Sequence, residues 1–190
     1  NANVLIPRPE TEELAYRCFK NADILHFNHI MDIGTGSGCI AIYLKSKLPK
    51  ATMKAIDVSN EALELANRNA LKYKTKIEFE QLDFLTFFPN ERSLEMIVSN
   101  PPYIGQHEMK LMSNEVLNFE PHLALFPNST DIDIFYRRIA EYGQLSLVAG
   151  GQVLCEINEY RAEQIMSIFK SYEYQNVTLH RDLQDKNRII

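Results

Sequence analysis

Short apolar runs alternate with amphipathic segments along the chain. The runs are rich in β-branched residues and end in Gly, Asp or Asn, which is typical of strands in a buried parallel sheet. They predict strands at 29–33, 52–56, 77–82, 94–99, 152–157 and 175–179. The amphipathic segments predict helices at 37–48, from Ser59 or Asn60 onward, and at 108–117, 133–147 and 161–169.

Strands that alternate with helices imply right-handed crossovers and an α/β fold, with a largely parallel sheet covered by helices on both faces. Such a sheet binds its ligand at the carboxyl ends of its strands. Four polar residues fall at those expected ends: Asp32, Asp57, Asp83 and Asn100. This pattern predicts which edge of the sheet carries the site.

Composition indicates one ordinary globular domain. The chain has 190 residues, of which 45% are hydrophobic and 24% charged. These values exclude a disordered chain, a collagen and a coiled coil, and a chain of this length buries roughly 70% of its unfolded surface. The net charge of -5 argues against a nucleic-acid partner held by phosphate neutralisation. We expect a monomer without direct nucleic-acid binding.

The sequence also predicts a cytoplasmic protein without a metal. Cys18, Cys39 and Cys155 lie far apart, so we expect buried thiols in a reducing compartment and no metal site. No apolar run approaches the roughly 18 residues of a membrane span. The first residue is Asn1 and not Met, so we expect that a segment upstream is missing.

A glycine-rich loop follows the first expected strand. It consists of Gly34, Thr35, Gly36, Ser37 and Gly38. Glycine allows a sharp turn and lets a ligand approach the backbone closely. A plain strand-to-helix turn would not need three alternate glycines, and a dinucleotide fold has the spacing G-x-G-x-x-G. The G-x-G-x-G spacing after Asp32 instead matches the loop of S-adenosylmethionine enzymes.

Polar residues at the next two strand ends suit a nucleoside. Asp57 is placed to accept hydrogen bonds from both ribose hydroxyls, although NAD enzymes also use an acid there. Asp83 could accept from the adenine amino group or simply cap a turn. Phe84, beside it, offers an apolar or stacking surface, and on its own would be taken for a core residue.

The loop after the fourth expected strand carries the candidate catalytic residues. It contains Asn100, Pro101, Pro102 and Tyr103. Two prolines stiffen the loop, and the Asn100 side-chain oxygen and Pro101 carbonyl provide two acceptors for a planar NH₂ group. Tyr103 could hold that group flat. Such a site works mainly by orientation, without a strong base at the outset. The alternative is a rigid Pro-Pro turn without chemistry.

Three sequence segments form a distinctive set. They are the loop Asn100–Tyr103, the run Pro7-Arg8-Pro9-Glu10-Thr11-Glu12, and the run Glu120-Pro121-His122-Leu123-Ala124-Leu125-Phe126. Together they resemble the HemK/PrmC family, the bacterial peptide chain release factor N5-glutamine methyltransferases. The resemblance implies a Rossmann-like, seven-stranded methyltransferase sheet and S-adenosylmethionine as cofactor. It implies that the substrate is the glutamine of the Gly-Gly-Gln motif in class 1 release factors. It also implies that Gly34–Gly38, Asp57, Phe84 and Asn100 contact the cofactor, and that Asn100–Tyr103 hold the glutamine amide.

The chain departs from the family pattern in three places. Residues 1–190 match the catalytic domain, and nothing corresponds to the family's N-terminal helical domain, which helps to bind the release factor. Glu156-Ile157-Asn158 stands where the family tends to have Glu-Ile-Gly, and Asp182–Asp185 lacks a glycine after Asp-Leu. We expect these last two changes to affect surface turns and to leave the chemistry untouched. Arg8 and Glu12 join the site only through the resemblance, because Pro9 could simply begin a helix.

Other functions stay open at this point. A ribosomal-protein glutamine methyltransferase would share the same loop. An adenine-N6 nucleic-acid methyltransferase would place a flipped base on Tyr103, but it would need a basic cleft, which this acidic chain does not suggest. A non-catalytic module that binds S-adenosylmethionine would be expected to have lost the Asn100–Tyr103 loop. The glycine spacing disfavours an NAD-dependent dehydrogenase.

Overall fold

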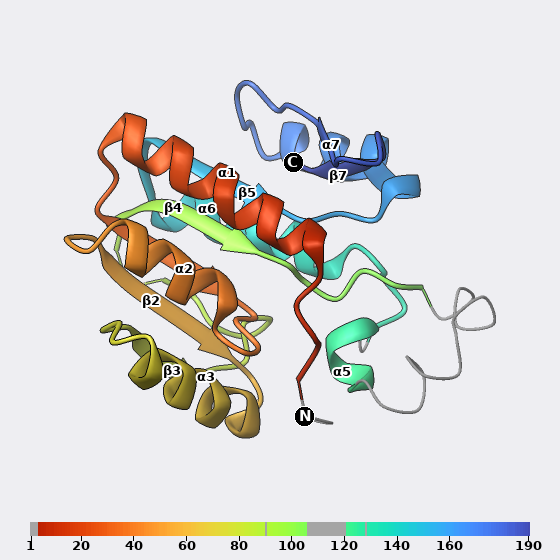
Figure 1. Cartoon of the computed structure of the whole chain (residues 1–190). Helices are drawn as coiled ribbons and strands as arrows, with labels where there is room; N and C mark the ends of the chain where they lie inside the picture. The colour runs from red at the N-terminus through yellow and green to blue at the C-terminus, as the bar shows by residue number, and fades with distance from the viewer. Residues whose placement is uncertain (1–3, 90, 106–120, 128) are drawn as a thin grey trace.

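The computed structural model describes residues 4–89, 91–105, 121–127 and 129–190 (Figure 1). The first half of the chain contains α1 (Pro9–Leu25), β1 (His29–Ile33), α2 (Cys39–Lys47), β2 (Thr52–Asp57), α3 (Asn60–Lys72), β3 (Glu78–Gln81) and β4 (Leu94–Ser99). The second half contains α5 (His122–Leu125), α6 (Ile134–Ser146), β5 (Leu147–Cys155), the 3₁₀ turn η2 (Glu159–Arg161), α7 (Ala162–Ser171), β6 (His180–Arg181) and β7 (Asn187–Ile189).

Five parallel strands form the central sheet, in the order β3-β2-β1-β4-β5. The chain reverses its direction of travel across the sheet between β3 and β4, so β1 and β4 are neighbours at the switch point, where such sheets bind ligands. Figure 1 shows α1, α2 and α3 over one face and α6 and α7 over the other. The expected α/β fold with helices on both faces is confirmed.

Two apolar clusters lie on opposite faces of the sheet because successive strand residues point to opposite sides. On the α1–α2 face, Ile30 and Met96 pack with Leu14 of α1 and Leu44 of α2. On the other face, the adjacent strand residues Met31 and Ile97 pack with residues of α6 and α7, among them Tyr136, Ile139, Ile165 and Phe169. Strands β1 and β4 are therefore almost fully buried, which is why their sequences are mainly apolar.

Seven strands in one sheet are not confirmed. Strands β6 and β7 form a separate antiparallel pair, and an isolated bridge between Glu156 and Ile189 ties β7 to the chain after β5. The strand predicted at 175–179 is wrong. Glu173 and Asn176 have positive φ angles of 62° and 55°, so the chain turns twice there, and strand pairing begins only at His180.

The remaining boundaries differ in smaller ways. The strand predicted at 152–157 begins earlier, at Leu147, and is followed by a bridge at Glu156. The helix predicted at 161–169 is preceded by η2 and extends to Ser171. The helix predicted at 108–117 lies outside the described residues. No helix in the described part of the chain is long and apolar enough to cross a membrane.

Candidate active site

The ends of three neighbouring strands are aligned at the carboxyl edge of the sheet. Ile33 of β1 pairs with Ser99 of β4, and Ser99 pairs with Cys155 of β5. The Ser99 hydroxyl donates a hydrogen bond of 2.8 Å to the Ile33 carbonyl, which fixes the two central strand ends to each other. The residues that follow these ends therefore lie side by side, at the edge that the polar strand ends predict.

The glycine loop after β1 has the backbone conformation that its glycines allow. Gly34, Gly36 and Gly38 have φ angles of 70°, 56° and 79°, a region that other L-residues rarely adopt. The Gly34 and Thr35 N–H groups both donate to the Ile56 carbonyl at the end of β2. A Cβ atom on Gly34 would meet nothing within 4 Å, so the loop leaves open space in front of this residue.

Asp57 connects this loop to the start of α3. Its Oδ2 accepts a hydrogen bond of 2.8 Å from the Gly36 N–H, and its Oδ1 accepts one of 3.0 Å from the Ser59 N–H. Burial raises the pKa of the carboxyl group, while these backbone donors act in the opposite direction. A carboxylate has about four lone-pair sites, so Asp57 retains acceptor capacity for a ligand beside the loop.

Asp32 lies inside the site, although sequence reasoning gave it no binding or catalytic role. Its side chain is fully buried; Oδ2 accepts 2.7 Å from the Thr35 hydroxyl, and Oδ1 has no hydrogen-bond partner among the described residues. Burial raises the pKa of the Asp32 carboxyl from 3.8 to about 7, and the charge of Asp57 adds to this shift. The available signal was an acid inside a buried apolar strand, directly before the glycine loop.

Asp83 and Phe84 have contacts that explain their positions without a ligand. Asp83 is exposed, and its Oδ1 accepts 3.0 Å from the Leu85 N–H, as a turn cap does. The Phe84 ring is 5% exposed and lies edge-on to Tyr142, with a centroid distance of 5.3 Å. The Arg138 guanidinium stands 5.7 Å from the Phe84 centroid. Contacts of both residues with adenine stay a prediction.

The loop after β4 presents two acceptors that have no hydrogen-bond partner in the described part of the chain. Asn100 Nδ2 donates 3.0 Å to Thr11 Oγ1 of α1, which leaves Asn100 Oδ1 directed elsewhere. Within the described residues, neither Asn100 Oδ1 nor the Pro101 carbonyl accepts a hydrogen bond. Pro101 is buried, whereas Asn100, Pro102 and Tyr103 are half-buried. The arrangement can receive a planar group with two N–H donors.

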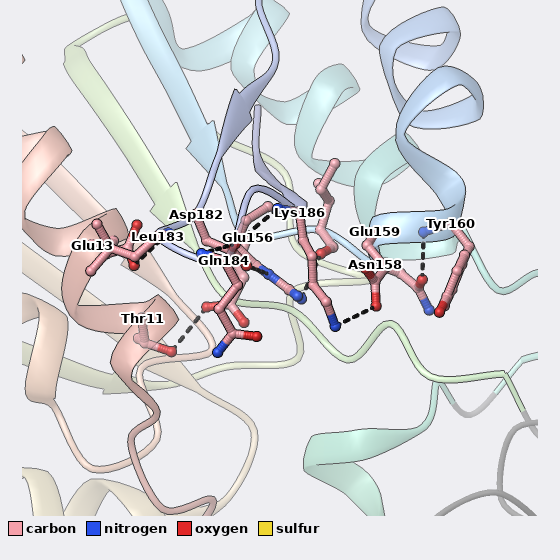
Figure 2. A network of polar contacts seen from close by, with 12 residues as sticks. Thr11, Glu13, Glu156, Asn158, Glu159, Tyr160, Asp182, Leu183, Gln184 and Lys186 are labelled. Carbon is pink, nitrogen blue, oxygen red and sulfur yellow. Dashed lines mark hydrogen bonds and ion pairs between the residues drawn. The ribbon is translucent and has the colours of Figure 1, made fainter.

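Glu156 contacts this loop through its side chain and was missed by the sequence reasoning. Its side chain is 1% exposed, and its Oε1 accepts a hydrogen bond of 3.0 Å from the Tyr103 hydroxyl. Its Oε2 accepts one of 2.9 Å from the Thr11 hydroxyl (Figure 2). The expectation that Glu156–Asn158 is a surface turn is wrong, because Asn158 is also only 7% exposed. Burial raises the pKa of the Glu156 carboxyl and of the Tyr103 hydroxyl, and the two groups are hydrogen-bonded to each other.

A short turn beside Glu156 joins the last two strands to the rest of the site. Figure 2 shows Leu183 at this turn, where its N–H donates 3.3 Å to Glu13 of α1. Lys186 forms an ion pair of 3.2 Å with Glu159 of η2. Asp185 has a φ angle of 62° and thus adopts the conformation for which glycine is common. The turn therefore forms without the glycine that the family pattern has.

Comparison with known proteins identifies the family. A protein-family profile described as "Methyltransferase small domain" matches residues 11–123. A release factor glutamine methyltransferase of Flavobacterium psychrophilum is 42% identical over 100% of this chain and 68% of its own length. One of Bacteroides thetaiotaomicron is 41% identical over 98% of this chain and 67% of its own length. The chain belongs to the release factor glutamine methyltransferase family.

Solved methyltransferases share the fold. The ribosomal protein L11 methylase of Lactobacillus delbrueckii subsp. bulgaricus aligns with 98% of this chain and 80% of its own, with a TM-score of 0.68 and 18% identity. Magnesium protoporphyrin IX methyltransferase of Synechocystis PCC 6803 aligns with 95% and 77%, with a TM-score of 0.59 and 13% identity. At these identities the two solved structures show only that the chain shares their fold.

This methyltransferase chain covers part of the length of the relatives named above, and two of its family-like runs contain the start of a helix. The chain spans about two thirds of the length of the relatives named above. In the N-terminal run, Pro9 is the first residue of α1, as the helix-start alternative predicts, with Glu10 and Glu12 in the first turn. In the run from 120 to 126, Glu120 lies outside the described residues, and α5 begins at His122.

Proposed function

We propose that this chain transfers a methyl group from S-adenosylmethionine to the side-chain amide nitrogen of a glutamine, and that the glutamine belongs to the Gly-Gly-Gln motif of a class 1 release factor. The observation that carries the proposal is the pair of acceptors at Asn100 and Pro101, which have no hydrogen-bond partner among the described residues and follow the strand next to the one that leads into the glycine loop. Membership of the release factor glutamine methyltransferase family supports the same substrate.

The residues around the glycine loop fit S-adenosylmethionine. The ligand carries an ammonium group, ribose hydroxyls and a sulfonium, and no phosphate. Asp32 Oδ1 is a buried acceptor without a partner among the described residues, which suits an ammonium donor, and Asp57 keeps acceptor capacity for ribose. Gly34 offers the open space that a close approach to the backbone requires. We assign adenine to the side of Asp83 and Phe84.

The loop residues orient the target nitrogen. Asn100 Oδ1 and the Pro101 carbonyl accept the two N–H bonds of the glutamine amide, and the Tyr103 ring supports its plane. Holding both hydrogens fixes the direction in which the nitrogen lone pair points, which is the main requirement for in-line attack. When bound, S-adenosylmethionine would supply an activated methyl on a positively charged sulfur; as the amide nitrogen gains this methyl, the sulfur–methyl bond would break and neutral S-adenosylhomocysteine would leave. The nitrogen would release one proton to solvent.

A labelling experiment tests this assignment. Purified chain is incubated with tritiated S-adenosylmethionine and, in separate reactions, a class 1 release factor, ribosomal protein and duplex DNA. We expect label only in the release factor, and none when the glutamine of its Gly-Gly-Gln motif is replaced by glutamate. Label in the ribosomal protein or the DNA, with none in the release factor, would overturn the substrate assignment.

A further inference from the structure

Four side chains from three parts of the chain form one line of hydrogen bonds, which begins and ends in the catalytic loop. Asn100 donates to Thr11 at 3.0 Å, Thr11 donates to Glu156 at 2.9 Å, and Tyr103 donates to the other oxygen of Glu156 at 3.0 Å. Thr11 and Glu156 are 5% and 1% exposed. We call Thr11 and Glu156 the relay pair.

While Glu156 is ionised, the hydrogen bonds between Asn100, Thr11 and Glu156 can run in only one direction, with Asn100 as the first donor and Glu156 as the last acceptor. A carboxylate only accepts hydrogen bonds, so the single hydroxyl proton of Thr11 must point at Glu156. Thr11 can then only accept from Asn100. The Nδ2 group of Asn100 therefore faces Thr11, and its Oδ1, which accepts no hydrogen bond among the described residues, stays available to a ligand.

From this geometry we propose that Thr11 and Glu156 are positioning residues: they fix which end of the Asn100 amide meets the substrate. The inference rests on the proposed function, in which Asn100 Oδ1 accepts an N–H of the target glutamine. A rotated Asn100 amide would present its own NH₂ to the glutamine NH₂, and two donors cannot form a hydrogen bond. Without the relay pair, a share of the protein would hold Asn100 in this unproductive orientation.

The backbone around Glu156 does not need the carboxylate for its own stability. The Glu156 N–H donates 3.0 Å to the Ser99 carbonyl, and the Glu156 carbonyl accepts 2.9 Å from the Tyr136 hydroxyl. Both carboxylate oxygens are bonded to groups of the catalytic loop and α1 instead. Burying a carboxylate is unfavourable, and such groups gather at functional sites. Burial raises the pKa of Glu156, which is consistent with this cost.

The decisive variants remove or retain the Thr11 hydroxyl. Thr11→Val keeps the shape of the side chain but removes the hydroxyl, and Thr11→Ser retains it. We expect Thr11→Val to lower kcat on a Gly-Gly-Gln substrate by about 10- to 100-fold, the size of one lost orienting contact or somewhat less. Thr11→Ser should stay within about threefold of wild type. The KM for S-adenosylmethionine should change little in both variants.

A control variant removes a threonine hydroxyl elsewhere. Thr75→Val deletes a bond from Thr75 to the Ala70 carbonyl at the end of α3, remote from the catalytic loop, and should retain wild-type kcat. If Thr11→Val also retains wild-type kcat, while the wild type labels the release factor, the relay pair has no positioning role and the proposed function stands.

A double-mutant cycle separates positioning from a general structural effect. If Thr11 acts through Asn100, then Thr11→Val should add less than about twofold to the loss already caused by Asn100→Ala. A further loss equal to that of Thr11→Val in the wild-type background would show that Thr11 acts independently of Asn100, and would overturn the inference.

A measurement without substrate keeps the relay testable if the substrate assignment fails. The side-chain NH₂ resonances of Asn100 can be identified in the ¹⁵N spectrum by their loss in Asn100→Ala. We expect slow hydrogen exchange of this NH₂ in the wild type and in Thr11→Ser, and fast exchange in Thr11→Val. Equal exchange rates in all three proteins would overturn the relay, whatever protein or nucleic acid is methylated.

Discussion

The carboxylate of Asp57 holds the backbone of Gly36, because its Oδ2 accepts a hydrogen bond of 2.8 Å from the Gly36 N–H. The end of β2 thereby fixes the glycine loop that follows β1. Since the same carboxylate also accepts from the Ser59 N–H, it joins the loop to the first turn of α3. Asp57 thus adds to the bonds from Gly34 and Thr35 to the Ile56 carbonyl in fixing the geometry of the expected cofactor site.

Binding of S-adenosylmethionine should therefore depend strongly on Asp57. We expect the chain to bind S-adenosylmethionine and not NAD, and Asp57→Ala to weaken binding at least about tenfold, because hydrogen bonds to a charged group contribute about 1.5–3 kcal/mol each. Isothermal titration calorimetry measures both. The control is Asp23→Ala, which removes an exposed acid from α1. Binding of NAD without binding of S-adenosylmethionine would contradict the cofactor assignment.

Replacing Asn100 should stop methyl transfer with little effect on folding. Asn100→Ala removes the acceptor for the target N–H on a half-buried loop, together with one hydrogen bond to Thr11. We expect kcat to fall by about 10²–10³ and the stability to fall by only about 1 kcal/mol. Single-turnover transfer from labelled S-adenosylmethionine and urea unfolding test the two parts. Wild-type turnover would be incompatible with an amide clamp at this loop.

Two glycines with similar φ angles allow the stability cost of backbone strain to be measured apart from the cost of steric crowding. Gly38 and Gly150 have φ angles of 79° and 82°. A Cβ on Gly38 would lie 3.1 Å from the Cβ of Ala66, whereas a Cβ on Gly150 would meet nothing within 4 Å. Gly150→Ala should cost about 1–2 kcal/mol from strain alone. Gly38→Ala should cost about 1–3 kcal/mol more, because α2 and α3 are closely packed there. Equal losses in urea unfolding would show that crowding adds nothing.

Sequence reasoning succeeded where the signal is local. Strands 29–33 and 94–99 were placed with their observed bounds, because both are buried on two faces and are mainly apolar apart from Asp32 and Glu95. The glycine loop and the Asn100–Tyr103 loop were found because each is a short motif after such a strand. Their positions at one edge then follow from the parallel fold.

The errors arise where tertiary contacts decide the outcome. The segment 175–179 is rich enough in β-branched residues to favour a strand, but the turns at Glu173 and Asn176 displace the pairing to His180. The bond between Thr11 and Glu156 joins residues 145 positions apart. Nothing local in either segment indicates the other, so the acid beneath the catalytic loop was taken for part of a surface turn.

Asp32 should make the stability of the protein depend on pH. Burial raises the pKa of its carboxyl from 3.8 to about 7, so between these values the folded state binds more protons than the unfolded state. The contribution of Asp32 to stability is therefore fully present below about pH 4 and is lost as the pH rises to about 7. A shift of this size corresponds to a loss on the order of 4 kcal/mol.

The variant Asp32→Asn removes this titration while Asn can still accept the bond from the Thr35 hydroxyl. Urea unfolding between pH 4.5 and 8 should show the stability of the wild type falling relative to that of Asp32→Asn as the pH rises. Asp23→Asn, at an exposed position of α1, should follow the wild-type curve. If the wild-type and Asp32→Asn curves ran parallel across the whole range, Asp32 would titrate alike in the folded and unfolded states, and its burial would not govern its protonation.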